Sequence, residues 1–265
     1  MYSNKPIILL KITRKEHIKS IIDEGFFHFT LASYFRENAI ANPNSLIYDI
    51  DECSYSRLHI VYLENNITKK RAKIFDKDSG HMAHNRNQCL FCTYAPNIKQ
   101  TFTSWDEKKK CYNMSISKED IKELCNGNPC NDYGIIIFEF PYKTIDKIDK
   151  EFKKRGITGA AGYVQYDDHY FEIKGDPQSL DNCIECAFHK RKNYSNQNEY
   201  RIVALNKTTE NLTSIRIGQL DDDEFSVHNI ETDKDLLVEI HPYINKKFSE
   251  TAVALSLDYI DVKWV

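Results

Sequence analysis

The 265-residue chain has no apolar run that approaches the length needed to cross a bilayer. The apolar residues that follow its N-terminus, Ile7 to Leu10, are too few for the core of a signal peptide. The chain also lacks a positive excess, because 36 lysines and arginines stand against 39 acidic residues, a formal net charge of −3. That balance argues against tight non-specific binding to nucleic acid, although it leaves room for a nucleic acid as a transient substrate. We therefore expect a cytoplasmic protein with no membrane contact.

Internal repeats, low-complexity linkers and a glycine-rich phosphate loop are also missing. Because no linker divides the chain, we expect residues 1–265 to form a single domain. Short apolar segments between turn residues predict many short strands, and 134–140, which is almost entirely apolar, is expected to be a central one. Helices are predicted at 14–23, 145–155 and 179–192, and the one at 145–155 is amphipathic. This pattern is typical of an α+β fold with peripheral helices.

Helix boundaries are predicted from capping residues. Thr13 and Glu16 have the spacing of a capping box at the start of the first helix, and Gly25 suits its C-terminal end. Ser117 is expected to cap a further helix that ends near Cys125.

Eight cysteines in a chain without a secretory signal favour free thiols or a metal site over disulfides. Two Cys-x-x-Cys pairs occur near histidines: Cys89/Cys92 after His81 and His84, and Cys183/Cys186 before His189. On residue types alone they could form a zinc site. Residues 89–92 are predicted to be a buried strand, however, in which residues three apart face opposite ways. We therefore favour buried structural cysteines.

The most informative segment runs from Tyr194 to Val203, where polar turn residues lead into a β-type pattern. Side chains alternate between the faces of a strand, so Gln197 and Glu199 are predicted to point the same way from one extended segment. An amide and a carboxylate held together in this way can hydrogen-bond to a sugar hydroxyl and orient a second substrate. The alternative is an edge strand with a solvated polar face, in which Glu199 pairs with Arg201 or with a lysine across the sheet.

This arrangement resembles the catalytic turn of mono-ADP-ribosyltransferases, which carry a Gln-x-Glu at the start of a strand after an aromatic-bearing turn. The resemblance implies a mostly antiparallel, split β core, NAD as co-substrate, Glu199 as the catalytic acid and Gln197 as the residue that positions the acceptor. In that family an early strand supplies a basic residue to the NAD phosphates, which would be Lys11 or His28 here. A middle strand shapes the nicotinamide pocket, and here this would be the Phe91-Cys92-Thr93-Tyr94 segment through Cys92 and Thr93.

The likeness extends over most of the chain to a recurring bacterial layout of motifs. Its parts are Tyr34 to Arg36, Asp49 to Glu52, 91–93, 134–140, 190–201 and 241–244. On these motifs the chain is similar to mRNA-modifying toxins of phage-defence toxin–antitoxin–chaperone systems. The similarity implies an RNA acceptor, specifically mRNA, rather than a protein acceptor, with an antitoxin protein and a chaperone as partners. It also implies that Tyr34 or Tyr194 stacks on nicotinamide or an acceptor base, and that Tyr34 and Arg36 belong to the cofactor site.

Electrostatics explains the role that the resemblance gives to Glu199. When the nicotinamide–ribose bond breaks, positive charge builds on the ribose, and a carboxylate bonded to the 2′-hydroxyl stabilises it and can help to deprotonate the nucleophile. Two other functions stay open: a non-catalytic ligand-sensing or binding module of a defence system, and a Mg²⁺-dependent nuclease that uses Asp49, Asp51 and Glu52. Arg36 also has a structural alternative, as a bridge to Asp49 or Asp51.

Overall fold

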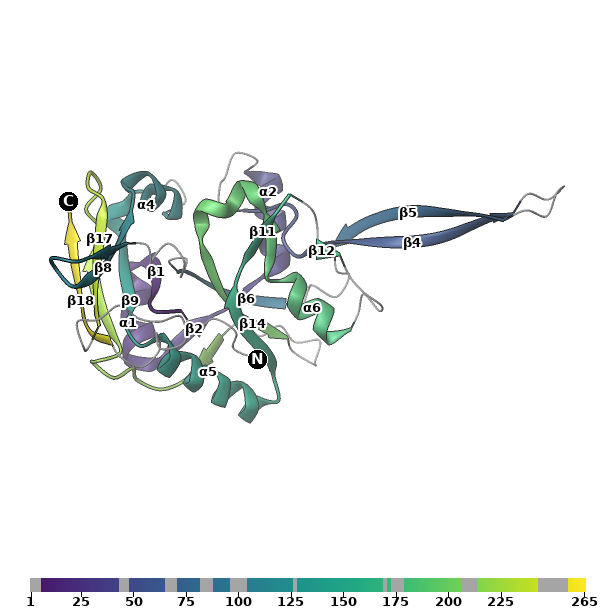
Figure 1. Cartoon of the computed structure of the whole chain (residues 1–265). Coiled ribbons are helices and arrows are strands. Elements are labelled where there is room, and N and C mark those ends of the chain that lie inside the picture. The colour runs from purple at the N-terminus through teal and green to yellow at the C-terminus, as the bar shows by residue number, and fades with distance from the viewer. Residues whose placement is uncertain are drawn as a thin grey trace.

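The computed structural model describes residues 6–42, 48–64, 71–81, 88–95, 104–125, 128–168, 171–172, 179–205, 214–242 and 257–265. Its architecture is α+β, with helices around sheets whose strands pair mostly antiparallel, as the sequence predicts (Figure 1). Within these ranges no helix is both long and apolar enough to span a membrane. The single domain over 1–265 stays a prediction.

The largest sheet has seven antiparallel strands. Six of them run in the order β10 (Thr158–Tyr163), β14 (Glu199–Leu205), β6 (Gln88–Tyr94), β1 (Leu9–Arg14), β9 (Tyr133–Phe138) and β16 (Phe225–Asn229). The short β3 (Thr30–Leu31) also pairs with β6. The apolar segment predicted at 134–140 is β9, and it lies between β1 and β16, so its prediction as an internal strand is confirmed.

A second sheet packs on one face of the first. Its order is β18 (Leu257–Trp264), β17 (Leu236–Pro242), β8 (Cys111–Ile116) and β7 (Trp105–Asp106). Ile135 and Ile137 of β9 share an apolar cluster with Val238 and Ile240 of β17. The side chain between the two isoleucines, Ile136, belongs to a different cluster on the opposite face. The alternation of side chains along β9 therefore gives the large sheet an apolar core on each side.

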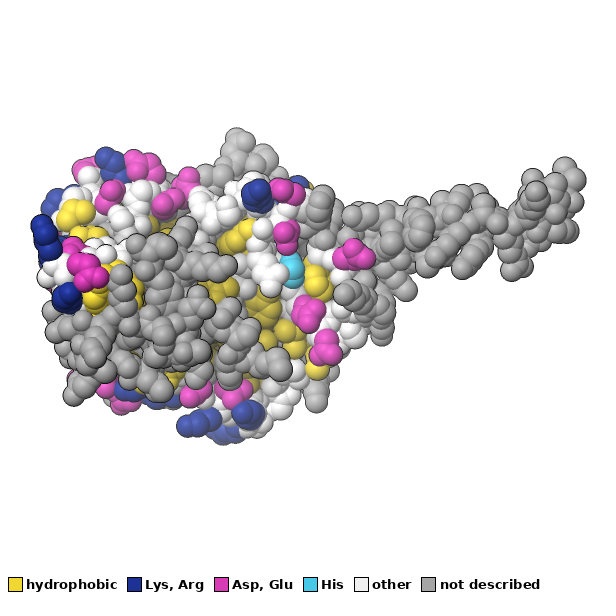
Figure 2. All heavy atoms as spheres, viewed as in Figure 1, with side chains coloured by type: hydrophobic (Ala, Val, Ile, Leu, Met, Phe, Trp, Pro, Cys, Tyr) yellow, Lys and Arg dark blue, Asp and Glu magenta, His cyan; other side chains and the backbone are white. Residues whose placement is uncertain are grey.

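Helices α1 (Lys15–Glu24) and α5 (Pro141–Arg155) contribute to the second of these cores, beside the short pair β2 (Phe26–His28) and β15 (Ser214–Arg216). Ile21 of α1 and Phe152 of α5 pack there with Phe27 and Phe91, whose ring centroids lie 5.0 Å apart. Lysine and arginine side chains gather at the lower edge of Figure 2, where α5 ends in a basic last turn. Positive charge there complements the helix dipole.

The capping residues are partly as predicted. Gly25 ends α1 in the left-handed conformation, with φ of 57°. Ser117 caps α4 (Lys118–Leu124), because its hydroxyl accepts the backbone N–H of Asp120 at 3.0 Å. The capping box at Thr13 and Glu16 is wrong, since Thr13 pairs with Gly134 in the β1–β9 ladder and the strand continues to the start of α1.

A third cluster lies where α2 (Ala32–Ala41) and α6 (Leu180–Cys186) meet β6 and β14. The helix predicted at 179–192 is too long. It ends at Cys186, and β13 (His189–Arg191) follows and pairs in parallel with β11 (Gln165–Asp167). The ladder offered by β11 overrides the helical pattern, and the 3₁₀ helix η3 (Lys192–Gln197) then leads into β14.

All eight cysteines are free. Cys89, Cys183 and Cys186 are buried in apolar clusters, and Cys92 is partly exposed. Among the described side chains neither Cys-x-x-Cys pair belongs to a group of metal ligands. His84 lies outside the described residues.

A long hairpin projects from the body of the molecule in Figure 1. It consists of β4 (Ser54–Glu64) and β5 (Arg71–His81), which pair antiparallel, and β12 (Phe171–Glu172) pairs in parallel with β4.

The short 3₁₀ helix η2 (Cys130–Asp132) precedes β9.

Candidate active site

A cavity of about 390 Å³ opens over the neighbouring strands β1, β6 and β14. Seven of the eight residues predicted to form the site line it: Lys11, His28, Tyr34, Cys92, Thr93, Gln197 and Glu199. Tyr94 and Tyr133 border it as well. Segments far apart in the sequence thus contribute to one pocket because β1, β6 and β14 are adjacent in the sheet.

Gln197 and Glu199 reach the pocket by a route that differs from the prediction. Gln197 ends η3, Glu199 begins β14, and Asn198 between them has φ of 40° and ψ of 52°. The prediction of one extended segment is therefore wrong, because the left-handed Asn198 turns the chain between helix and strand. Asparagine tolerates this conformation better than most residues. The two side chains still border the same cavity.

The carboxylate of Glu199 is held from two sides. Lys190 Nζ donates to Oε1 at 3.0 Å, and Arg201 Nε donates to Oε2 at 2.5 Å. Burial would raise the pKa of Glu199, but the charges and hydrogen bonds of Arg201 and Lys190 outweigh burial and lower the pKa to about 2. Glu199 is therefore ionised at neutral pH. The pairing with Arg201 that the structural alternative predicted is present, and the carboxylate still borders the cavity.

Arg201 is fully buried and links Glu199 to a second carboxylate, that of Glu52. Its Nη1 and Nη2 donate to the two oxygens of Glu52 at 2.6 and 3.0 Å, a bidentate pair. Nη1 also donates to the backbone carbonyl of Ala187 at 2.7 Å. Lys190 Nζ lies 3.7 Å from Glu52 Oε2. Glu52, Lys190, Glu199 and Arg201 thus form one buried group of two anions and two cations, which we call the charge cluster.

Gln197 is tied to the charge cluster through Lys190. Lys190 Nζ donates to Gln197 Oε1 at 2.5 Å and lies 4.7 Å from the centre of the Tyr194 ring. The Tyr194 hydroxyl donates to the backbone carbonyl of Tyr48 at 3.1 Å. Tyr194 is buried and packs over Lys190, so of the two tyrosines predicted to stack on a ligand, Tyr34 is the one that borders the cavity.

Lys11, Cys92 and Thr93 line the cavity from β1 and β6. Lys11 Nζ donates to the backbone carbonyl of Cys92 at 2.8 Å and lies 4.8 Å from the centre of the Phe91 ring. Burial lowers the pKa of Lys11, although Cys92 and Glu199 act in the other direction. Burial, with the charge of Glu199, raises the pKa of the Cys92 thiol to about 12, so this thiol is not a nucleophile at neutral pH. Thr93 Oγ1 donates to the backbone carbonyl of Tyr200 at 2.9 Å.

His28 and Tyr34 stand at the rim. Burial and nearby positive charge lower the pKa of His28, which leaves the imidazole neutral at pH 7. The Tyr34 side chain is 47% exposed, and its ring meets those of Phe35 and Tyr48 edge-on at centroid distances of 6.2 and 6.1 Å. An exposed ring at the mouth of a cavity can stack on a planar ligand.

Arg36 is the predicted site residue that lies outside the cavity lining. Its Nη1 donates to the backbone carbonyl of Glu52 at 2.8 Å, so it braces the segment that carries Glu52 rather than facing a ligand. Asp51 forms an ion pair with Arg191, and Asp49 Oδ1 accepts the backbone N–H of Asp51 at 2.8 Å. Arginines thus already neutralise Asp51 and Glu52, which argues against their use as magnesium ligands in a nuclease.

Lys190 is a residue of the candidate site that the sequence interpretation missed. Its segment was predicted to be helical, which would place it off the sheet. Nothing in the sequence predicts that Lys190 pairs with Glu199, nine residues later. The two residues meet because β13 and η3 reverse the direction of the chain between them. The charge cluster therefore depends on tertiary structure.

Comparisons with protein-family models, curated proteins and solved structures found no match to this chain. The site is therefore interpreted from its own chemistry. It offers an ionised carboxylate, an amide, a lysine and an exposed aromatic ring around one cavity. This combination suits a ligand with a sugar, a planar ring and a negative charge.

Proposed function

We propose that the chain is an NAD-dependent ADP-ribosyltransferase in which Glu199 acts on the ribose next to nicotinamide. The observation that carries the proposal is that Lys11, Thr93 and Glu199, from an early, a middle and a late strand, border one cavity. The same order of a basic residue, a pocket strand and a glutamate is what the resemblance to mono-ADP-ribosyltransferases implies.

The charge on Glu199 fits the reaction. When the bond between nicotinamide nitrogen and ribose C1′ breaks, its electron pair leaves with neutral nicotinamide and a positive charge stays on the ribose. A carboxylate that is ionised and fixed before reaction stabilises this charge without reorganising. The acceptor then bonds to C1′ and releases its proton to solvent.

The low pKa of Glu199 also limits what the residue does. A carboxylate with a pKa of about 2 is a weak base, so it is poorly suited to take that proton at neutral pH. We therefore assign to Glu199 the electrostatic role and the bond to the ribose 2′-hydroxyl. Lys190 and Arg201 are positioning residues, because they act through the Glu199 carboxylate.

The rest of the lining suits NAD. A cavity of about 390 Å³ has the size of small-molecule sites and can hold the nicotinamide–ribose end. Lys11 donates one of its three ammonium protons to Cys92, which leaves two for a phosphate. Tyr34 at the rim is placed to stack on nicotinamide or on an acceptor base, and the amide of Gln197 to orient the acceptor.

Labelled NAD incubated with total cellular RNA and protein tests the proposal. We expect label in a fraction that ribonuclease degrades and protease does not, because we favour RNA, specifically mRNA, as the acceptor. Label in neither fraction would overturn the transferase assignment, and label in protein alone would overturn the RNA acceptor. As a toxin of an anti-phage defence system, the wild-type chain should arrest growth when expressed without an antitoxin protein.

A second function is favoured by one observation. Both oxygens of Glu199 are already engaged by Lys190 and Arg201, an arrangement that would also serve a non-catalytic site that binds a nucleotide. Binding of NAD by the wild-type chain without release of nicotinamide would favour this binding module over the enzyme.

A further inference from the structure

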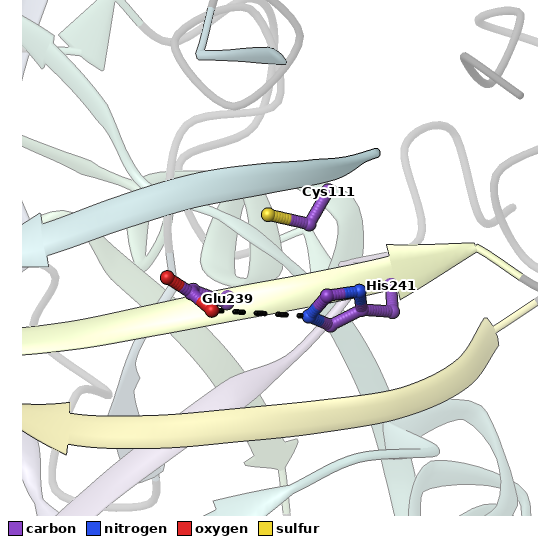
Figure 3. A group of neighbouring side chains, drawn as sticks. All are labelled: Cys111, Glu239 and His241. Atoms are coloured by element: carbon purple, nitrogen blue, oxygen red, sulfur yellow. Dashed lines mark ion pairs between the residues drawn. The ribbon is translucent and has the colours of Figure 1, made fainter. Parts of the chain in front are cut away.

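A second group of reactive side chains lies on the four-stranded sheet, and none of its members borders the cavity. Cys111 stands at the start of β8, and Glu239 and His241 stand on the neighbouring β17 (Figure 3). Their sulfur, oxygen and nitrogen atoms all lie within 4.8 Å of one another.

The strand register brings these side chains together. Glu239 and His241 are two residues apart, so they share one side of β17, and Asn113 is the register partner of Glu239 on β8. Cys111 shares the side of Asn113. Ile240, which lies between Glu239 and His241, belongs to the apolar core. The three side chains of the group therefore face away from that core. Cys111, Glu239 and His241 are nevertheless buried, with at most 9% of each residue exposed.

We propose that Cys111, Glu239 and His241 bind one Zn²⁺ ion. Thiolate, imidazole and carboxylate are the ligands of protein zinc sites, whereas Mg²⁺ and Ca²⁺ prefer oxygen alone. Tetrahedral zinc with bonds of about 2.0 to 2.3 Å sets its ligand atoms roughly 3.3 to 3.6 Å apart. Glu239 Oε2 and His241 Nε2 are 3.9 Å apart, so a small side-chain rotation closes this pair around an ion.

The remaining coordination chemistry balances. Cys111 loses its proton to solvent when its sulfur binds the ion, and the thiolate and carboxylate together neutralise the charge of Zn²⁺. Asn113 Oδ1 lies 3.8 Å from Cys111 Sγ, and this oxygen or a water molecule completes the tetrahedron. Because the ligands come from two strands, the ion would fasten β8 to β17.

Two lysines occupy the Glu239 carboxylate and compete with an ion. Lys109 Nζ donates to Oε1 at 2.5 Å and Lys263 Nζ to Oε2 at 2.9 Å. Without a metal these contacts alone would account for a buried glutamate. The two lysine side chains are 52% and 46% exposed, so both can turn to water when the ion binds. Lys263 also contacts Asp261 at 2.6 Å, which keeps it paired after displacement.

Metal titration of the full chain tests the site. After chelator treatment, we expect one Zn²⁺ per chain in competition with a chromophoric chelator, and a thiolate-to-cobalt absorption band when Co²⁺ replaces Zn²⁺. Cys111→Ala and His241→Gln should lose both signals. Cys130→Ala, which removes a buried cysteine outside the group, should keep both.

The competing lysine provides a test that does not depend on a core substitution. Lys109→Ala changes a half-exposed side chain and removes one ammonium from Glu239, so it should bind Zn²⁺ about two- to fivefold more tightly than the wild-type chain. Wild-type protein without a stoichiometric site, Cys111→Ala with unchanged affinity, or Lys109→Ala with weaker binding would each overturn the proposal. If Cys111→Ala does not fold, the Lys109→Ala titration decides.

Discussion

Replacing Arg201 by methionine should destabilise the protein strongly. Arg201 is 1% exposed and donates four hydrogen bonds, two to Glu52, one to Glu199 and one to Ala187. Methionine fills much of the volume but leaves two buried carboxylates with Lys190 as their shared cation. Removing one partner of a buried ion pair costs about 3 to 5 kcal/mol, a large part of the roughly 5 to 15 kcal/mol by which a domain is stable.

Urea denaturation of Arg201→Met against a matched variant measures this cost. Arg216→Met removes an arginine that is 63% exposed and pairs with Glu24 at 3.0 Å, so it should cost less than about 1 kcal/mol. A double variant that also replaces Glu52 by methionine should recover part of the loss, because it removes one of the unpaired anions. Equal costs for Arg201→Met and Arg216→Met would refute the reasoning that the charge cluster is a buried, mutually dependent unit.

Two further changes test the surroundings of the site. Burial, with the charge of Glu52, raises the pKa of Asp49 from 3.8 to about 6, so Asp49 binds a proton more readily in the folded state than in the unfolded state. The contribution of Asp49 to wild-type stability should therefore fall as pH rises from about 4 to 6. Asp49→Asn removes the buried charge but keeps the Oδ1 acceptor for the Asp51 N–H. The variant should therefore be more stable than wild type at pH 8 and differ little from it at pH 4. Urea midpoints at the two pH values check this, and equal midpoints at pH 8 would contradict it. Gly25→Ala should destabilise the protein more than Gly156→Ala. Both glycines are left-handed, but a Cβ added at Gly25 would lie 2.1 Å from the Gly218 carbonyl oxygen. A Cβ added at Gly156 would meet nothing within 4 Å. Thermal unfolding compares the two variants. An equal loss of melting temperature would contradict the explanation from the close approach at Gly25.

Local signals in the sequence predict local structure well. Ser117 caps its helix and Gly25 ends another, because each effect depends on a side chain or backbone conformation within a few residues. The capping box at Thr13 fails because β9, more than a hundred residues away, draws Thr13 into a ladder. The helical pattern that reaches residue 192 fails for the same reason, since residues 189–191 pair with β11.

The candidate site also combines features that the sequence predicts with features that depend on tertiary contacts. The residue types at Lys11, Thr93 and Glu199 suggested a shared pocket only through resemblance, since sequence order does not reveal that β1, β6 and β14 are neighbours. The αL turn at Asn198 and the return of Lys190 to Glu199 depend on tertiary packing. Arg36 was placed in the site by its motif, yet it lies outside the cavity lining and donates to the backbone carbonyl of Glu52.

Release of nicotinamide from NAD tests the central claim most directly, because it reports cleavage of the bond next to the ribose whatever the acceptor. We expect the wild-type chain to release nicotinamide and Glu199→Gln to do so about 10² to 10³ times more slowly, with NAD still bound. Glu224→Gln is the matched control, since Glu224 is also buried and paired with a lysine, Lys147, at 2.8 Å, but lies outside the cavity lining. It should keep the wild-type rate, and circular dichroism should show that both variants are folded. No nicotinamide release by the wild-type chain, or an equal rate in folded Glu199→Gln, would contradict the account.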